Sequence, residues 1–369
     1  MYTESDLVRI AKRENNKKRN YLVVDPLQGK HIPVSPGKAL QVFSELAKLL
    51  EIYKDERLLV VGFAETATAI GAQIARDLGA GYIQTTREKI PDVEYLFFSE
   101  EHSHATEQKL VKDDLDGIMD KIDRIIFAED EVTTGKTILN LITVLEQHYG
   151  RKTKFSVASL LNGMSEEAME AFACRGIGLH YLVKIRHDNY PQAADRVVED
   201  GIYHEQDVIG TEDTEFFDVA GRMDTRRFTD MACYEDACHM LFDEIKGHIP
   251  LEEYKKILVL GTEEFMFPGL YVGKCLEESG YFVRFHATTR SPIAVSSSEE
   301  YPLHERYALS SLYEEGRKIF VYDIGAYDAV IVMTDAQKNG QNGLMGKLSL
   351  LNAIRKKNTN VYLVRWCGK

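Results

Sequence analysis

The sequence predicts an α/β protein with mostly parallel sheets, and three observations support this fold class. Short apolar runs alternate along the chain with longer segments in which apolar residues recur at helical spacing. The short runs are continuously apolar, as expected of parallel strands that are covered on both faces. The alternation fades and then restarts in the second half, so we expect two domains, residues 1–210 and 211–369.

In the first half, the expected strands are runs rich in Val, Ile, Leu, Phe and Tyr, which favour extended chain. A helix rich in Ala and Ile follows the first of them, which is ended by Gly62. We predict strands at 58–61, 82–84, 95–98, 124–128, 155–160 and 181–185, and helices at 67–78 and 138–149. Strands that alternate with helices indicate a parallel sheet with helices on both faces.

Between about residues 186 and 228 the periodicity weakens, and we interpret this part as connecting segments. A second series of alternating elements then follows. We predict helices at 234–246 and 269–279, and strands at 257–260, 282–285, 329–333 and 361–364. The second half is therefore a second α/β domain.

The two halves also resemble each other in sequence, as an internal repeat would. The matching segments are 59–65 with 258–264, 85–87 with 288–290, and the strands before Asp130 and Asp335. One interpretation is that the second domain is a diverged copy of the first. The alternative is that two α/β domains share strand–glycine–helix units for physical reasons alone. Unlike strand orders would exclude the copy.

Composition excludes several classes of protein. The net charge of −13 disfavours general nucleic-acid binding, which needs a basic surface. No apolar run approaches the roughly 18 residues that cross a bilayer, so we expect no membrane segment. The first residues lack the charged and apolar regions of a signal peptide, and the five cysteines form no C-x-x-C pair. The expected location is a reducing cytoplasm.

The strongest functional signal is the run from Arg124 to Thr137. An apolar strand leads to the adjacent carboxylates Glu129 and Asp130, and a short turn then opens a helix. At the carboxyl edge of a parallel sheet, the unpaired N–H groups and positive dipole end of such a helix attract phosphate. The residues of the turn are Thr133, Thr134, Gly135, Lys136 and Thr137. Acids do not bind phosphate, so Glu129 and Asp130 suit ribose hydroxyls or the water shell of Mg²⁺.

Two other interpretations of this run are an N-cap and a Walker-type loop. The first is an ordinary helix N-cap with acids on the surface, since Thr and Asp are good caps. The second is a Walker-type loop, because Gly135-Lys136-Thr137 has its G-K-T ending. A Walker loop requires a glycine five residues before Gly135, where this chain has Asp130, so that interpretation fails.

The run resembles the motif with which type I phosphoribosyltransferases bind phosphoribosyl pyrophosphate (PRPP). The resemblance consists of four apolar residues, two acids, two variable residues and T-T-G-x-T. It implies a parallel-sheet fold in which Glu129 and Asp130 hold the ribose hydroxyls and residues 133–137 hold the 5-phosphate. Glu131 departs from the motif, because the family usually has an apolar residue there.

A wider resemblance covers nearly the whole chain. The first half resembles the divergent phosphoribosyltransferase domain of bacterial stress-response and tellurite-resistance-type gene clusters. The second half resembles the TRSP domain that follows it, on the segments 222–224 and 261–266. The resemblance implies synthesis of a nucleotide-like metabolite and leaves the acceptor open.

Two further loops follow predicted strands. The loop 62–68 lies where the family places its pyrophosphate-binding loop, so Ala64, Glu65 and Thr66 are candidate ligands through backbone N–H groups and a hydroxyl. Glu65 is unfavourable beside pyrophosphate unless Mg²⁺ intervenes. In the segment 85–89, Arg87 is suited to bidentate contacts with pyrophosphate, and Lys89 could assist as a point charge. The alternative for the loop 62–68 is a plain strand–helix turn, and the alternative for the segment 85–89 is a solvated loop.

The segment 98–105 resembles part of the loop that closes over such sites and excludes water. Its His102 and His104 are candidates for contact with the substrate. Metal binding by the two histidines and an ordinary surface position are the alternatives.

The predicted activity is Mg²⁺-dependent transfer of phosphoribose from PRPP to an unidentified acceptor, with release of pyrophosphate. The candidate catalytic residues are Glu129, Asp130, Arg87 and Lys89, and the first two are also the candidate metal ligands. Such a reaction needs positioning and charge stabilisation more than acid–base chemistry. The alternative is a sensor that binds PRPP without transfer. The expected partners are PRPP and the acceptor, and a second copy of the chain, forming a homodimer, is a further possibility.

Overall fold

The computed structural model describes residues 2–14, 16, 19–98, 108–205, 214–337 and 340–368, without the side chains of 340–342. The chain forms two compact units that interleave along the sequence. The first unit consists of residues 1–4, 40–186 and 223–236, and the second of residues 5–39, 187–222 and 237–369. The predicted boundary between residues 210 and 211 lies outside the described residues.

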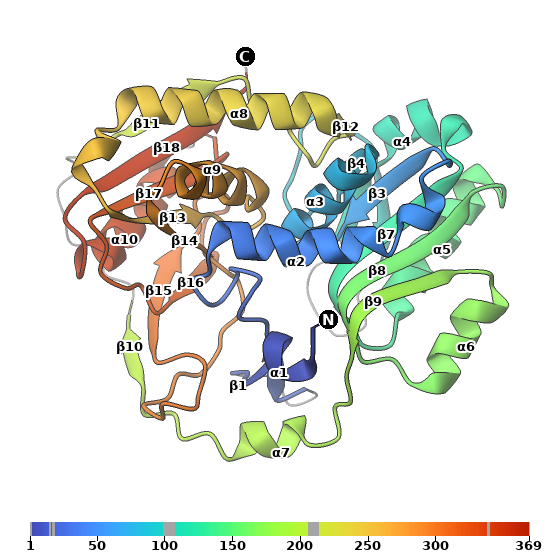
Figure 1. Ribbon diagram of the computed structural model, residues 1–369, viewed down its shortest axis with the longest axis horizontal. Coiled ribbons are helices and arrows are strands. Elements are labelled where there is room, and N and C mark those ends of the chain that lie inside the picture. The colour runs from blue at the N-terminus through green and yellow to red at the C-terminus, as the bar shows by residue number, and fades with distance from the viewer. Residues whose placement is uncertain are drawn as a thin grey trace. The chain divides into compact units, whose positions relative to one another are not determined.

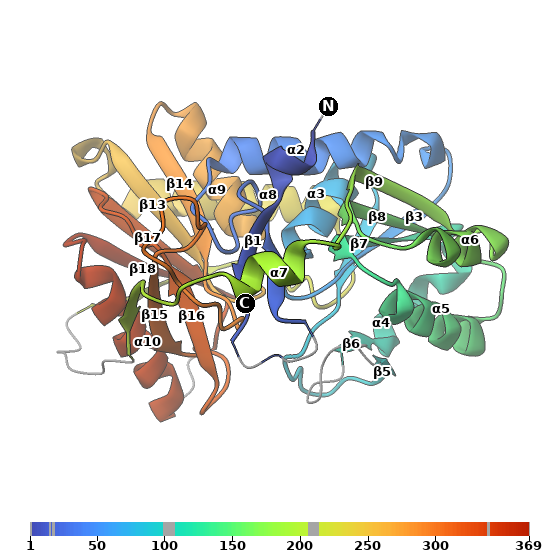
Figure 2. The same ribbon diagram turned by 90° about the horizontal axis from the view of Figure 1, so that it is seen from below.

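The main sheet of the first unit is parallel except at one edge (Figure 1). Its order is β12 (Thr229–Asp230), β4 (Gly81–Gln84), β3 (Leu58–Gly62), β7 (Arg124–Val132), β8 (Lys154–Asn162) and β9 (Gly178–Lys184). Helices α3 (Thr68–Leu78) and α5 (Lys136–Tyr149) cover opposite faces, as Figure 2 shows. Ile125, Ile126 and Phe127 of the central strand β7 are fully buried, which explains their unbroken apolar run.

The remaining elements of the first unit lie around this sheet. They are the helices α4 (Lys112–Ile118) and α6 (Glu166–Cys174), the 3₁₀ turns η1 (Glu51–Tyr53) and η2 (Met119–Lys121), and the strands β5 (Tyr95–Phe98) and β6 (Gln108–Val111). The predicted strand 95–98 forms, but it pairs antiparallel with β6 outside the main sheet. Its inclusion in the parallel sheet was wrong. An isolated apolar run of four residues does not reveal which strand will pair with it.

The main sheet of the second unit is parallel throughout. Its order is β11 (Phe216–Ala220), β18 (Val361–Cys367), β17 (Ala329–Thr334), β13 (Lys256–Gly261) and β14 (Phe282–Ala287). Helix α10 (Gly340–Arg355) follows β17, and α9 (Phe267–Glu278) follows β13. Leu258, Val330 and Ile354 belong to one buried cluster, so β13, β17 and α10 share a core.

Other elements extend the second unit. They are the helices α1 (Glu4–Leu7) and α7 (Tyr190–Asp195), the 3₁₀ turn η3 (Leu251–Glu253), and the strands β1 (Arg9–Lys12), β2 (Tyr21–Val24), β10 (Ile202–His204), β15 (Glu305–Ser310) and β16 (Lys318–Tyr322). Strands β15 and β16 form an antiparallel hairpin like that of β5 and β6. Helices α2 (Pro36–Lys48) and α8 (Met231–His248) contribute residues to both units.

The two main sheets have the same internal order. In the first unit β4, β3, β7 and β8 are neighbours, and in the second β14, β13, β17 and β18 are. The registers agree as well, since Gly62 pairs with Ala128 and Gly261 with Met333. Asp130 and Asp335 therefore both lie two residues beyond the paired position. These four strands have the order that a repeat would give, whereas the next strand differs: β9 follows β8 in sequence, and β11 precedes β18.

Each unit completes its sheet edge with a segment from the other half of the sequence. At the β4 edge of the first unit, Tyr82 pairs antiparallel with Thr229. At the β14 edge of the second unit, Phe285 pairs antiparallel with Val34. Thr229 and Val34 each lie two residues before a helix, α8 and α2. The segments before these helices are thus exchanged between the two units.

The predicted α/β fold with a second α/β domain is confirmed, and every predicted strand and helix is present at its predicted place. The chief extension is β7, which continues from residue 128 through Val132. The strands β1, β2, β6, β10, β11, β12, β15 and β16 were not predicted. Among the described residues, no helix is long and apolar enough to span a bilayer.

Candidate functional site

The candidate site lies where three neighbouring strands of the first unit end. Strand β3 leads into the loop 63–67, β4 into the segment 85–89, and β7 into the turn 133–135. Because β4, β3 and β7 are parallel neighbours, their carboxyl ends meet at one edge of the sheet. The structure therefore gathers at this edge the described residues that the sequence singled out.

Gly135 shapes the turn after β7. Its φ of 73° is left-handed, which glycine adopts without strain, and it caps the start of α5. A Cβ atom at this position would lie 2.5 Å from the ring of Phe172, a fully buried residue of α6. Both observations require glycine here. The amide of Lys136 contacts the Thr134 hydroxyl at 3.3 Å, while the Lys136 side chain is exposed.

Helix α5 presents its N-terminus at this turn. The first N–H groups of a helix have no carbonyl partner within the helix, and the dipole adds partial positive charge. Thr133, Thr134 and Thr137 are half-buried and add hydroxyl groups beside this end. The turn therefore has the groups that a phosphate needs.

The two acids lie within the last residues of β7, both half-buried. The Thr66 hydroxyl donates a hydrogen bond of 2.8 Å to Asp130 Oδ1, which ties the loop after β3 to β7. Burial raises the pKa of Asp130, the hydrogen bond from Thr66 opposes that rise, and the nearby charge of Glu131 adds to it. Asp130 thus has a neutral hydrogen-bond donor, Thr66, and an acidic neighbour, Glu131.

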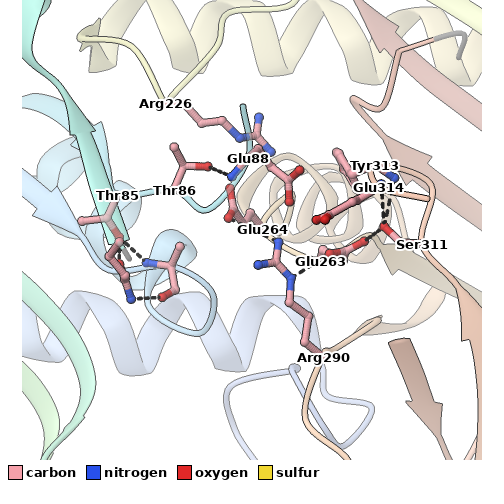
Figure 3. Close-up of polar contacts among 12 residues, drawn as sticks. Thr85, Thr86, Glu88, Arg226, Glu263, Glu264, Arg290, Ser311, Tyr313 and Glu314 are labelled. Carbon is pink, nitrogen blue, oxygen red and sulfur yellow. Dashed lines mark hydrogen bonds and ion pairs between the residues drawn. The ribbon is translucent and has the colours of Figure 1, made fainter. Parts of the chain in front are cut away.

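Ala64 is held at both of its backbone polar groups. Its N–H donates to Thr85 Oγ1 at 2.8 Å, and its carbonyl accepts from Gln108 Nε2 at 2.8 Å. The Thr85 hydroxyl in turn donates to Gln108 Oε1, and all three residues are buried. The Ala64–Glu65 peptide bond is cis. Figure 3 shows this group of contacts around Thr85.

The basic candidates occupy different environments. Arg87 is half-buried and directly follows Thr86, whose hydroxyl accepts a hydrogen bond of 2.9 Å from the Glu88 amide. Lys89 is exposed. His102 and His104 lie outside the described residues. Among the basic candidates that the structure describes, Arg87 is the half-buried one, and it lies three residues beyond the end of β4.

The positioning role of Thr85 and Gln108 is not predicted from the sequence, in which Thr85 is only the first residue of the segment 85–89. A polar pair on short strands gives no signal of its own until both side chains are seen to be buried. Their burial with mutual hydrogen bonds shows that they fix the backbone of the loop after β3.

A segment from the second half of the sequence supports the end of β4. The Gln84 amide donates to the Thr225 carbonyl at 2.8 Å, and the Thr225 hydroxyl donates to Gln84 Oε1 at 2.8 Å. Arg227 forms two bonds of 2.7 Å to the carboxylate of Asp114 in α4. Gln84 directly precedes Thr85, so this segment fixes the strand from which Thr85 projects.

The acids also suit a magnesium ion. Mg²⁺ prefers carboxylate oxygens, uses few protein ligands and retains water or phosphate oxygens. The half-buried pair Glu129 and Asp130 fits that preference. In the part of the chain that the structure describes, no group of three or more His, Cys, Asp or Glu residues is placed to hold a metal.

Comparison with solved structures finds adenine phosphoribosyltransferases among its matches. The Giardia lamblia enzyme, complexed with 9-deazaadenine, is 20% identical, with a TM-score of 0.38, covering 51% of this chain and 100% of that one. The Rhodothermus marinus enzyme is 17% identical, with a TM-score of 0.37, covering 49% and 96%. The Trypanosoma brucei enzyme, with AMP, pyrophosphate and ribose-5-phosphate, is 13% identical, with a TM-score of 0.35, covering 49% and 77%. No curated protein matches.

Comparison with protein families gives two matches that together span most of the chain. Residues 7–186 match a family described as phosphoribosyl transferase. Residues 221–352 match the TRSP domain, described as C-terminal to that same family. Both matches occur here in the stated order: residues 7–186 belong to the phosphoribosyl transferase family, and residues 221–352 to the TRSP domain that follows it.

Proposed function

We propose that the first unit binds PRPP with Mg²⁺ and transfers its phosphoribosyl group to an acceptor, releasing pyrophosphate, in the synthesis of a nucleotide-like metabolite. One observation carries the proposal: Asp130, tied to Thr66, lies five residues before a left-handed glycine that opens helix α5. This arrangement offers carboxylates for a sugar and N–H groups for its phosphate on one strand–turn–helix unit.

The roles of the residues follow from their chemistry. The turn 133–137 receives the 5-phosphate through its N–H and hydroxyl groups. Glu129 and Asp130 accept hydrogen bonds from the ribose hydroxyls. The backbone of the loop 64–66, fixed by Thr85 and Gln108, binds pyrophosphate together with Arg87. These groups orient PRPP and stabilise charge as the bond to pyrophosphate breaks.

Magnesium would be held through Glu129 and Asp130, with waters and substrate oxygens as its other ligands. When bound, it would neutralise charge on the leaving pyrophosphate. Its presence would also account for Glu65 in a loop that faces an anion. Lys89 is too exposed to have a fixed role, and we assign it a long-range attraction for the substrate.

A sensor that binds PRPP without transfer is the second candidate. Glu65 and Glu131 favour it, because each places a negative charge where the family motif does not require one. We place either function in the cytoplasm, where the five free cysteines suit reducing conditions. The small-molecule partners are PRPP and an unidentified acceptor, and a homodimer stays a prediction.

Titration of the whole protein with PRPP and Mg²⁺ tests the site. Replacing both acids, Glu129→Gln and Asp130→Asn, should lower the affinity for PRPP at least about 100-fold, since both charge and acceptor capacity for the ribose are reduced. Thermal melting controls for folding. Unchanged affinity in a folded variant would refute the assignment. Release of pyrophosphate in the presence of candidate acceptors separates the enzyme from the sensor.

A further inference from the structure

The loop after β13 in the second unit is built like the loop after β3 in the first. In the first unit, the Thr85 amide donates to the Gly62 carbonyl at 2.9 Å, and the Ala64 amide donates to Thr85 Oγ1 at 2.8 Å. In the second unit the same two bonds join Thr288 to Gly261 at 3.0 Å and Glu263 to Thr288 at 3.0 Å. Glu263 therefore stands in the place of Ala64.

The next residues agree as well. Thr86 exchanges two backbone hydrogen bonds with Lys109 of the hairpin, and Thr289 exchanges two with Phe320. The threonine hydroxyls then accept from the amide two residues on, at 2.9 Å from Glu88 and at 3.2 Å from Ser291. These matches place one arginine in each unit at the same point of the fold, Arg87 in the first and Arg290 in the second.

In the second unit, Arg290 and two residues of a neighbouring loop converge on the carboxylate of Glu263. Arg290 Nε and Arg317 Nη1 each lie 2.8 Å from its Oε2, and the Ser311 hydroxyl donates to Oε1 at 2.5 Å. The Glu263 side chain is 1% exposed. Figure 3 shows Arg290 and Ser311 directed at Glu263. Ser311 and Arg317 belong to the loop between β15 and β16.

This donor set is the kind that binds an oxyanion. Two guanidinium groups and a hydroxyl would serve phosphate or pyrophosphate as well as a carboxylate. The first unit uses the same place in the fold, by our proposal above, for pyrophosphate. In the second unit, Glu263 corresponds to Ala64, and its carboxylate is the anion that these donors contact.

We propose that the second unit is a copy of the transferase fold whose oxyanion site is already filled by the carboxylate of Glu263. The inference rests on the proposed function only in naming the first unit's loop as the pyrophosphate loop. It assigns to the TRSP domain a site that would accept an oxyanion but is closed to one in the natural sequence. Phosphorylated ligands then bind in the first unit alone.

Removing the carboxylate should open this site. Glu263 has a φ of 48°, so glycine and asparagine, which tolerate the left-handed region, are the suitable replacements. We expect Glu263→Gly and Glu263→Asn to remove the carboxylate that Arg290 and Arg317 share. Glu264 then stays 3.5 Å from Arg290, and Glu314 stays paired with Arg317. Inorganic pyrophosphate should then bind between them.

Calorimetric titration of the full chain with inorganic pyrophosphate provides the test. Each folded variant should bind one more equivalent than the wild type, and adding Arg290→Ala should abolish that extra binding. Pyrophosphate should also raise the melting temperature of the variants more than that of the wild type. Should the glycine variant fold only with pyrophosphate, that dependence supports the proposal as well.

Two results would overturn the inference. One is a folded Glu263 variant with the stoichiometry of the wild type. The other is a pair of variants that melt at the same temperature with and without pyrophosphate. The wild-type titration keeps the two proposals apart, because loss of pyrophosphate binding there would count against the first unit's site. The additional equivalent of pyrophosphate bound by the Glu263 variants would still report on the site in the second unit.

Discussion

Asp130 and Asp335 occupy the same place in two sheets of the same order, yet their surroundings differ. Asp130 is half-buried and accepts a hydrogen bond from the neutral hydroxyl of Thr66. Asp335 is buried, with Tyr313 donating to one oxygen at 2.7 Å and Arg222 lying 3.0 Å from the other. Asp335 thus has a charged partner, whereas the partner of Asp130 is a neutral hydroxyl, and by our proposal this difference leaves Asp130 available to a ligand.

The largest expected effect separates these two acids. Asp335→Asn removes the charge opposite Arg222 and should cost about 3 kcal/mol of stability, as for a broken buried ion pair. It should leave the affinity for PRPP unchanged, because in our proposal the acid pair of the first unit controls that affinity. Urea unfolding and PRPP titration of the variant measure both quantities. A large loss of PRPP affinity in a folded Asp335→Asn protein would contradict the comparison.

The next effect concerns Gly135, the left-handed glycine of the first unit's turn. Gly135→Ala should cost about 1–2 kcal/mol through its positive φ alone, and contact with Phe172 adds to that cost. PRPP affinity should fall at least about tenfold, or about 1.4 kcal/mol, because the turn that holds the phosphate must shift. Gly79→Ala is the matched control, since Gly79 is also left-handed, at φ 62°, with open space around it. The control should lose stability without losing affinity.

A third pair of variants compares the two equivalent threonines. Thr85→Val and Thr288→Val each leave a buried amide without its acceptor and should each cost about 1–3 kcal/mol. Only Thr85→Val should also weaken PRPP binding, because only the first unit's loop binds pyrophosphate in our proposal. Melting curves and titrations of both variants decide the point. Equal losses of affinity would mean that both loops serve the ligand.

The smallest effect is a dependence of stability on pH. Burial raises the pKa of Asp130, so this group opposes folding once the pH exceeds the ordinary pKa of an aspartate. Asp130→Asn removes that opposition and should therefore stabilise the unliganded protein at neutral pH. The gain should vanish in acid, below the ordinary pKa, where the wild-type carboxyl is protonated in both states. Urea unfolding across this pH range measures the change in the free energy of unfolding. A variant that is less stable than the wild type at neutral pH would contradict the prediction.

Much of the candidate site was predictable because its signals are local. The apolar run of β7, the acids that follow it and the glycine of the turn lie within fourteen successive residues, 124–137. Gly135 in particular is required by its own backbone conformation. The roles of Thr85 and Gln108 could not be predicted, because they depend on a hydrogen bond between β6 and the end of β4.

The sequence by itself determined most strands of the two main sheets, the helices that follow β3, β7 and β13, the glycine turn after β7 and the likeness of the two halves. Apolar periodicity and turn chemistry are properties of neighbouring residues, so they can be read along the chain. The tertiary structure alone decided that residues 223–236 join the first unit and that Val34 pairs with the edge of the second sheet. It alone also showed Arg290 and Arg317 closing on Glu263. Such pairings join residues far apart in sequence, and they depend on which sheet edges and loops meet when the chain folds.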